Sequence, residues 1–360
     1  MQEIDMTINK LPARTWRWLG MNEAKTEQLL PAVDGSCQPD VTIAGDGVKL
    51  EHLNEGTLGY LETGAGSEME KLAGDNRQAL HLKASAAGDN GVQQAVITYN
   101  YTDGKRCYDR LEIYAEAGSR LTVLMSAASA VDAAGLAAVE TRIYAGAGAQ
   151  VKLVQVQLLG SGFTHFNDIG CQADDDAAVE VLQLELGGST VYSGALANLT
   201  GSASSFKVET GYYGRGKQHL DMNYVALHRG KKSQSYLGAE GVMKDEARKL
   251  YRATIDFKTG SSGSVGEEVE GVLLLSDDAI NQTIPLILCS EEDVQGNHGA
   301  SIGRLDENLL FYLMSRGFSK DEAVNMMARA KIDALCRKID DENIVQQVQD
   351  YVEKVVQHAE

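Results

Sequence analysis

One histidine toward the C-terminal end of the chain has the setting of an accessible metal ligand. His298 lies between Asn297 and Gly299, and a further glycine occupies position 296, so little side-chain bulk surrounds the imidazole. A neutral imidazole is a good ligand for iron. The alternative is a turn histidine whose ring bonds to a backbone carbonyl.

A thiol and an acidic run precede this histidine. Cys289 lies nine residues upstream, and residues 291–293 are all acidic. A carboxylate cluster attracts iron cations electrostatically, and a thiolate binds them. The alternatives are a buried structural cysteine and a solvated acidic turn.

The elements that must position these groups are a strand and a helix. Ile284 to Leu288 is an apolar run that predicts a short buried strand ending in Cys289. After His298 a helix is expected, with Asp306 as N-cap, Glu307 in its first turn and Gly317 after its last turn. Its apolar positions, at helical spacing, are Leu309, Leu310 and Leu313.

Between residues 36 and 290, short alternating runs are separated by glycine, aspartate, asparagine and serine, a pattern typical of strands. A template of one turn residue, two further positions and then apolar-polar-apolar-apolar recurs. It places Leu121, Val151, Val179 and Phe206 at intervals of 30, 28 and 27 residues. A repeat of strands with almost no helical signal predicts a stacked β-solenoid, or β-helix. A β-sandwich explains the strands but not the regular spacing.

The two ends of the chain are expected to cap this solenoid. Residues 1–35 carry Trp16 and Trp18 and a short helical pattern from Met21 to Leu30, and we expect them to cover one end of the core. At the C-terminus, Ser319 and Glu322 form a capping box.

Two further helices follow from this cap and from the periodicity. The first has an apolar row formed by Ala323, Met326, Met327 and Ala330, and Asp340 or Asp341 is expected to cap the second. One face of the second carries Ile344, Val348, Tyr351, Val352 and Val355. We expect the C-terminal helices to pack on the end of the solenoid and to leave an apolar stripe for a partner.

Composition excludes several classes of function. A net charge of −18 opposes binding to nucleic acid or to anionic membranes, and the basic run 229–232 is interpreted as a solvated loop. No apolar run is long enough to span a membrane, and the N-terminus has no apolar secretion signal. The five scattered cysteines, with no CxxC pair, favour reduced thiols in a cytoplasm over a disulfide framework.

The chain also lacks the motifs of common enzymes. It contains no phosphate-binding P-loop, no dinucleotide loop and no nucleophile elbow. His219 and His228 are interpreted as structural, and the acidic run 174–176 as a turn. A carbohydrate-binding or carbohydrate-cleaving β-helix is the alternative function, for which the candidate aromatic groove consists of Tyr192, Tyr212, Tyr213, Tyr224 and Tyr236.

A family resemblance becomes specific at residues 298–317, HGASIGRLDENLLFYLMSRG, which resemble the C-terminal signature of the SufB/SufD family of iron–sulfur cluster assembly proteins. Gly299 follows the histidine where the SufB branch has glutamate, and in this the chain resembles the SufD branch. Three more blocks resemble the family: 11–24 (LPARTWRWLGMNEA), 220–230 (LDMNYVALHRG) and 271–279 (GVLLLSDDA).

The resemblance implies a mainly β fold, a right-handed parallel β-helix with a C-terminal α-helical domain and a short N-terminal helical segment. The corresponding domains are residues 1–35, 36–302 and 303–360. It also implies a non-catalytic, cytoplasmic scaffold that pairs with a SufB-like subunit, docks a SufC-like ATPase and binds no nucleotide itself.

The resemblance further implies a transient iron–sulfur cluster at the subunit interface, with His298 as a ligand and Cys289 as a weaker candidate. Many family members have cysteine where this chain has Gly296. A homodimer is the alternative state of the isolated chain.

Overall fold

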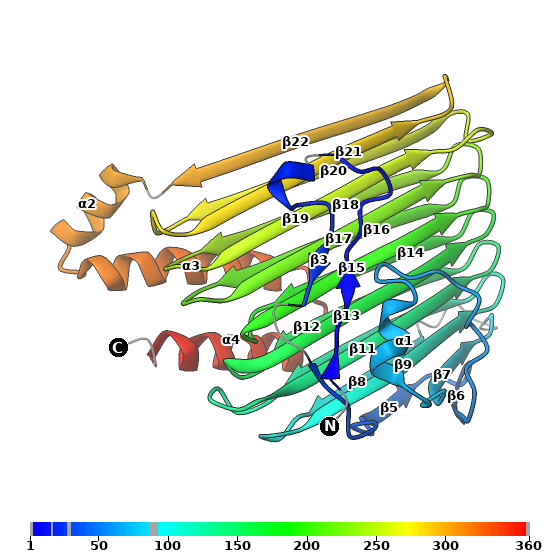
Figure 1. Ribbon diagram of the computed structural model, residues 1–360, viewed down its shortest axis with the longest axis horizontal. Coiled ribbons are helices and arrows are strands. Elements are labelled where there is room, and N and C mark those ends of the chain that lie inside the picture. The colour runs from blue at the N-terminus through cyan, green and yellow to red at the C-terminus, as the bar shows by residue number, and fades with distance from the viewer. Residues whose placement is uncertain (1–2, 16, 27–29, 87–92, 305, 358–360) are drawn as a thin grey trace.

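Apolar side chains at alternate positions of many short strands drive the chain to coil into a stack. The structure, a computed structural model, describes residues 3–15, 17–26, 30–86, 93–304 and 306–357. From β7 onward, successive strands alternate between two sheets, so each strand pairs with the strand two elements ahead (Figure 1). The fold is therefore a parallel β-solenoid, which confirms the predicted fold class.

The strands of the first sheet, in chain order, are β5 (Asp40–Ala44), β8 (Gln93–Asn100), β10 (Arg120–Ala128), β12 (Gln150–Leu158), β14 (Ala178–Glu185), β16 (Ser205–Gly214), β18 (Gln234–Met243), β20 (Ser264–Leu274) and β22 (Val294–Arg304). Those of the second sheet are β6 (Val48–Leu53), β7 (Ala79–Ala84), β9 (Arg106–Ala115), β11 (Ala134–Ala145), β13 (Gly162–Ala173), β15 (Thr190–Leu199), β17 (His219–His228), β19 (Arg248–Phe257) and β21 (Ile280–Cys289).

The repeat seen in the sequence corresponds to the strand register. Leu121 pairs with Val151, Val151 with Val179, and Val179 with Phe206. The turn residue that opens each copy, at positions 118, 148, 176 and 203, has a positive φ of 71°, 68°, 55° and 55°. Glycine adopts this conformation without strain and aspartate tolerates it, which explains three of the four positions, whereas Ala203 adopts it at a cost.

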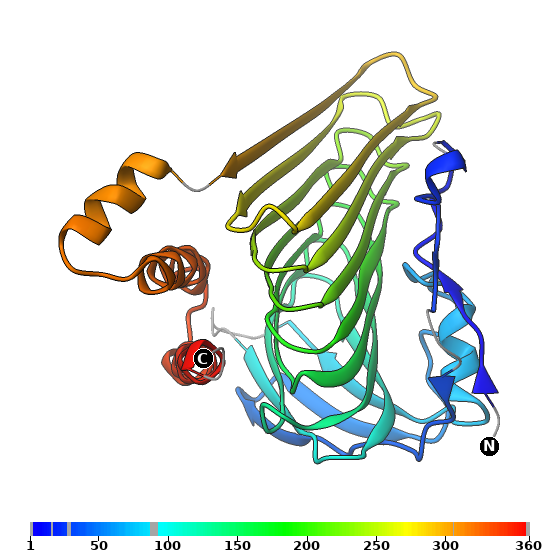
Figure 2. The ribbon, with the colours of Figure 1, turned by 60° about the vertical axis from the view of Figure 1, so that its left-hand side comes forward.

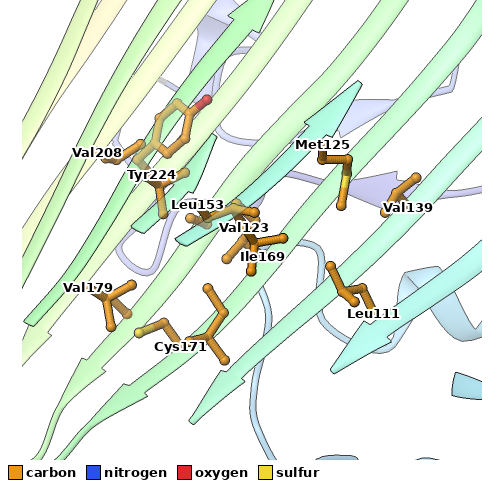
Figure 3. Close-up of a cluster of buried hydrophobic side chains, with 14 of the residues drawn as sticks. Leu111, Val123, Met125, Val139, Leu153, Ile169, Cys171, Val179, Val208 and Tyr224 are labelled. Atoms are coloured by element: carbon orange, nitrogen blue, oxygen red, sulfur yellow. The ribbon is translucent and has the colours of Figure 1, made fainter. Parts of the chain in front are cut away.

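The interior of the solenoid is one continuous apolar core shared by both sheets. Val123, Leu153 and Val181 come from the first sheet, Ile113 and Ile169 come from the second, and all five are fully buried. Figure 3 shows part of this core. Burying a side chain of this size contributes about 1.5–3 kcal/mol, so the stacked columns are the main source of stability.

The three C-terminal helices lie on the flank of the first sheet. They are α2 (Glu307–Ser315), α3 (Lys320–Cys336) and α4 (Glu342–Gln357). Leu335 of α3 and Val348 of α4 belong to a cluster with Val156 and Leu184 of the sheet's outer face. Figure 2 shows these helices beside the sheet rather than across its end. The predicted packing on the end of the solenoid is therefore wrong.

Several predicted helix caps are confirmed. Asp306 accepts hydrogen bonds from the first turn of α2, Ser319 and Glu322 form a capping box, and Asp341 accepts from the backbone N–H of Ile344 at 2.9 Å. The predicted buried face of α4 is also confirmed.

The predicted apolar row of α3 is mostly wrong, because Met326 and Ala330 are exposed and Met327 is half-buried, although Ala323 is buried. The buried row is Val324, Ala328, Ile332 and Leu335. Both rows have helical spacing, and contact with the sheet decides between them.

The N-terminal segment crosses the outer face of the second sheet instead of closing an end. It contains two short, nested antiparallel strand pairs, β1 (Glu3–Ile4) with β4 (Leu30–Pro31) and β2 (Thr7–Ile8) with β3 (Ala24–Lys25), and the 3₁₀ turn η1 (Arg17–Leu19). With α1 (Glu68–Ala73) it packs on outward side chains such as Tyr108 and Phe166. The N-terminal end of the solenoid is closed by β5 and β6, which pair antiparallel to their neighbours.

Two predictions for the N-terminal segment need correction or stay open. The helix expected from Met21 to Leu30 is wrong where the structure describes it, because Ala24 and Lys25 form a strand. Trp18 is 80% exposed and is not a packing residue. Trp16 and positions 27–29 lie outside the described residues.

A disulfide joins Cys37 to Cys107. It ties the segment before β5 to β9, so the prediction that all five cysteines are free thiols is wrong for two of them. Cys171, Cys289 and Cys336 are free, and only Cys289 among these three is exposed. Among the described residues, no helix is both long and apolar enough to cross a membrane.

Candidate functional site at the free end of the solenoid

The C-terminal end of the solenoid is open. β21 and β22 are the last strands of their sheets, and no described strand pairs with their outer edges. Every residue of β22 after Val294 is exposed, whereas strands in the middle of the stack are almost wholly buried. An exposed edge strand offers unpaired N–H and C=O groups that another strand can bond. We call β21 and β22 the free end.

His298 lies on this edge strand and not in a turn, so the alternative interpretation as a turn histidine is wrong. It is paired in register with Glu268 of β20, two residues after the Gly296–Gly266 pair. A Cβ built on Gly296 would lie 3.0 Å from Ile287 of β21, so this position faces the interior of the solenoid. Since side chains alternate along a strand, His298 faces the interior as well. It is nevertheless exposed, because no described strand continues the stack beyond β22.

Beneath His298 the interior holds three buried charged residues. Lys249 is 1% exposed, and Glu268 and Glu270 are each 2% exposed. The Lys249 ammonium bonds to the Glu270 carboxylate and lies 5.5 Å from the centre of the Tyr251 ring. We call these three residues the interior charged cluster.

Burial dominates the proton affinities in this cluster. It raises the pKa of Glu268 to about 8, with the nearby Glu270 charge adding to that shift and Lys249 opposing it. Burial lowers the pKa of Lys249, although Glu270 opposes the shift. A charged group in a poorly solvated interior needs an oppositely charged or hydrogen-bonding partner. Without one it becomes neutral by gaining or losing a proton.

Cys289 lies at the exposed end of β21, away from His298. Its thiol donates to the backbone carbonyl of Glu291 at 2.9 Å. Consecutive strands of the solenoid run in opposite directions, so the Gly296–Ile287 contact places His298 opposite Pro285. Cys289 lies four positions further along β21 than Pro285, which is about 13 Å. This chain therefore does not bring its two predicted ligands together.

The acidic residues after Cys289 mainly accept hydrogen bonds from the turn between β19 and β20. Glu291 accepts a hydrogen bond from the Gly260 backbone at 2.9 Å, and Asp293 accepts one from the Ser262 hydroxyl at 2.8 Å. Within the part of the chain that the structure describes, no three His, Cys, Asp or Glu side chains gather into a group that could hold a metal ion.

The other residues considered from the sequence have structural positions. His228 is buried inside the solenoid, and His219 lies at the opposite end of β17 and on its other face. Asp175 and Asp176 form a turn. Of the five tyrosines proposed for a carbohydrate groove, Tyr236 alone is not buried, so they do not line a groove.

The interior charged cluster was missed in the sequence because its burial opposes the usual pattern. On β20, Glu268 and Glu270 point inward, while Val265 points outward and is 36% exposed. In a strand that alternates valine with glutamate, the valines are expected on the buried face. The spacing of Glu268 and Glu270 shows only that they share a face.

A second exposed feature is helix α2. It contacts α3 and has no buried residue. Its large apolar side chains Leu309, Phe311, Tyr312 and Met314 are 40%, 75%, 50% and 47% exposed. We call these four residues the α2 surface. The adjacent hollow, about 450 Å³, is lined by Leu274, Leu275 and Leu310 together with charged groups that include Arg304 and Asp277.

These features define a parallel β-solenoid protein with helices on one flank and an open end that presents a histidine on an edge strand (Figure 1). Residues 97–331 match the family described as "SUF system FeS cluster assembly, SufBD core domain". The chain belongs to this SufBD family.

Individual relatives agree with this assignment and point to the SufD branch. The chain is 32% identical over 218 residues to the iron-sulfur cluster assembly protein SufD of Bacillus subtilis, covering 60% of this chain and 50% of that protein. It is 24% identical over 241 residues to a chloroplastic SufBD family protein of Arabidopsis thaliana, covering 64% and 42%. It is 25% identical over 191 residues to a SufBD family protein of Mycobacterium bovis, covering 53% and 23%. The matched region thus spans half or less of these relatives.

Proposed function

We propose that this chain is a SufD-like scaffold subunit that contributes to iron–sulfur cluster assembly and iron acquisition without catalysing a reaction alone. The observation that carries the proposal is the open end of a SufBD-family solenoid, where His298 is exposed on β22, an edge strand whose outer side pairs with no described strand. A scaffold needs an accessible ligand beside a surface that a second chain can cover. The proposed role places the chain in the cytoplasm.

The proposed partner at the free end is a SufB-like subunit. Edge strands β21 and β22 offer backbone groups to the edge strands of another solenoid, which would extend both sheets across the boundary. Such pairing would cover His298 and bring ligands from the second chain above it. In the absence of that subunit, a second copy of this chain is the alternative partner.

The proposed partner at the α2 surface is a SufC-like ATPase. This chain has no nucleotide-binding loop, so the ATPase activity must come from another subunit. An exposed amphipathic helix whose aromatic and methionine side chains face outward is a suitable docking element. ATP binding in that partner would drive a conformational change at the free end.

The transient iron–sulfur cluster is the cargo of this scaffold. In the proposal His298 donates an imidazole ligand, and thiolates come mainly from the partner, because Cys289 lies too far along β21 to act with His298. Cys289 remains a weaker candidate ligand of the same cluster, because the end of β21 would have to rearrange to bring its thiol to His298.

The proposal is tested by co-expression with a SufB-like and a SufC-like counterpart. We expect the three chains to copurify, and anaerobic reconstitution with iron and sulfide to give iron–sulfur absorbance that falls strongly in His298→Ala. His219→Ala, on the outer face of β17, is the matched control and should keep the absorbance. Failure of the wild-type chains to copurify would overturn the proposal.

A further inference from the structure

The N-terminal segment reaches the last strands of the second sheet along its outer face. The loop that joins β2 to β3 contains residues 9–15 and 17–22, and it doubles back on itself, because the Leu11 N–H donates to the Asn22 carbonyl at 2.8 Å. Figure 1 shows this dark blue segment running across the strands toward β21. We call these residues the strap.

The strap covers the outer face of the edge strand β21. Ile284 is the one buried residue of that strand, at 2% exposed. It belongs to an apolar cluster with Leu250 of β19 and with Leu11 and Met21 of the strap. The Gln282 amide of β21 also donates to the Met21 sulfur at 3.8 Å. Since β21 pairs with a described strand on one side only, its order depends on this cover.

A buried ion pair holds the strap in place. Arg252 of β19 is 0% exposed, and it donates to the two carboxylate oxygens of Asp221 at 2.6 Å and 3.2 Å. Its Nε atom donates to the Met21 carbonyl of the strap at 2.7 Å. From the other end of the strap, the Asn9 amide donates to the Asp221 carboxylate at 2.6 Å and to the Asp221 backbone carbonyl at 3.0 Å. Each member of the ion pair therefore bonds to the strap.

The polar character of this contact makes the strap suited to open on an intact solenoid. An ion pair that becomes exposed regains hydration, which offsets part of the lost contacts. Asn223, the register partner of Arg252, is 1% exposed, and neither polar atom of its side chain has a partner among the described residues. Opening the strap would let this side chain bond to water. The apolar part of the contact rests on Leu11 and Met21.

We propose that the strap is a conformational device that couples the N-terminal segment to association at the free end. The closed strap orders β21 and keeps its edge ready to pair with a second chain, whereas the open strap lets β21 fray. Because coupling between two sites is reciprocal, a chain bound at the free end also holds the strap closed. The inference rests on the proposed function for the partner, but the effect on β21 belongs to the isolated chain.

Hydrogen exchange of the purified full chain tests the strap without any partner. Asn9→Gly removes both bonds to Asp221, and glycine keeps the positive φ of 53° at this position. We expect the amides of β21 to exchange faster by about tenfold or more, and those of β11 and β13 to keep their wild-type rates. Met21→Ala, which retains the carbonyl that Arg252 bonds, should act in the same direction. Gln38→Gly is the matched control, because Gln38 also has a positive φ, 52°, but is exposed and lies outside the strap.

Unchanged exchange in β21 of Asn9→Gly, or an equal increase in Gln38→Gly, would overturn the inference. So would an increase of the same size in β11 and β13, because the substitution would then destabilise the whole solenoid.

Association with the SufB-like subunit provides the second measurement. We expect Asn9→Gly to bind that subunit about fivefold more weakly or worse than wild type, and the bound subunit to slow exchange in the wild-type strap. If the wild-type chain binds and Asn9→Gly binds equally well, the coupling is wrong. If the wild-type chain does not bind but β21 of the isolated variant exchanges faster, the proposed function fails and the effect of the strap on β21 stands.

Discussion

Among the single residues, His228 couples the stability of the solenoid to pH. It is fully buried, and its Nδ1 and Nε2 atoms each lie 2.8 Å from a serine hydroxyl, of Ser233 and Ser235 respectively. Burial lowers its pKa to about 4. The imidazole is thus neutral in the folded chain at pH values where it is protonated in the unfolded chain.

This depressed pKa predicts a loss of stability in mild acid. The contribution of the neutral, buried His228 to the free energy of unfolding is fully present above about pH 6.5. Up to about 3 kcal/mol of it is lost as the pH falls toward 4. We expect His228→Asn to be less stable than wild type at pH 7.5 but to lose less free energy of unfolding between pH 7.5 and 4.5. Urea unfolding at both pH values measures this difference. His52→Asn, at an exposed position, should behave like wild type; an unchanged acid loss in His228→Asn would contradict the assignment.

The disulfide between Cys37 and Cys107 predicts a dependence of stability on reductant. It closes a loop of 70 residues, and constraint of the unfolded chain by a loop of that length contributes about 4 kcal/mol. We therefore expect a reductant to lower the melting temperature of the wild-type chain and to leave that of Cys37→Ala unchanged. Cys289→Ala, which removes an exposed free thiol, should respond to reductant like wild type. If reductant does not change the melting temperature of the wild-type chain, the disulfide does not form.

At the level of helices and strands, the docking of α4 depends on one tyrosine. The Tyr351 hydroxyl donates to the Leu159 carbonyl at 2.8 Å, and Arg215 lies between the rings of Tyr351 and Tyr213, 5.8 Å and 5.6 Å from their centres. The hydrogen bond links α4 to the turn after β12. It fixes the position of the helix along the sheet, which apolar contacts alone leave free to slide.

Removing this hydroxyl should loosen α4 without unfolding the solenoid. Tyr351→Phe is expected to cost about 1 kcal/mol, because the Leu159 carbonyl loses one of its two donors and keeps only the Gly188 N–H at 3.2 Å. Hydrogen exchange should therefore speed up in α4 and remain slow in β14 and β16. Lys354→Ala, at an exposed position of the same helix, is the control. Equal exchange rates in Tyr351→Phe and wild type would show that apolar packing alone holds the helix.

These same elements show what the sequence can and cannot predict. The intervals between Leu121, Val151, Val179 and Phe206 predicted the register, because a solenoid converts a sequence period directly into a spatial one. Helix caps were predictable because their contacts are local. The apolar face of α4 was predictable too, but periodicity does not say which surface of the solenoid that face covers.

The site was harder to predict than the fold. The glycine-rich segment around His298 has no alternation of apolar and polar residues, so its sequence does not predict a strand. It forms β22 because it pairs with β20. Glu268 and Lys249 approach each other only because β19 and β20 face one another across the interior. The Cys37–Cys107 bond likewise depends on contacts between distant parts of the chain.

The molecule as a whole presents two separate exposed surfaces. The free end is formed by the last strands of the stack, and the α2 surface stands off the flank beside α3 (Figures 1 and 2). The interior-facing side of β22 includes Ile302, which is paired in register with the core residue Val272 and is 57% exposed. On α2, Phe311 is the most exposed of the large apolar side chains, at 75%.

Because the two surfaces are separate, a single substitution in one surface should weaken the binding of one proposed partner and leave the binding of the other unchanged. Ile302→Lys places a charge where another solenoid would pack, and we expect association with the SufB-like subunit, or with a second copy, to weaken by about tenfold or more while the SufC-like ATPase still binds. Phe311→Asp should do the reverse. Light scattering of the purified chain measures self-association, and copurification of each partner measures the two interfaces. Loss of both partners in either variant would show that the surfaces act as one, and retention of both partners in both variants would show that neither surface is an interface.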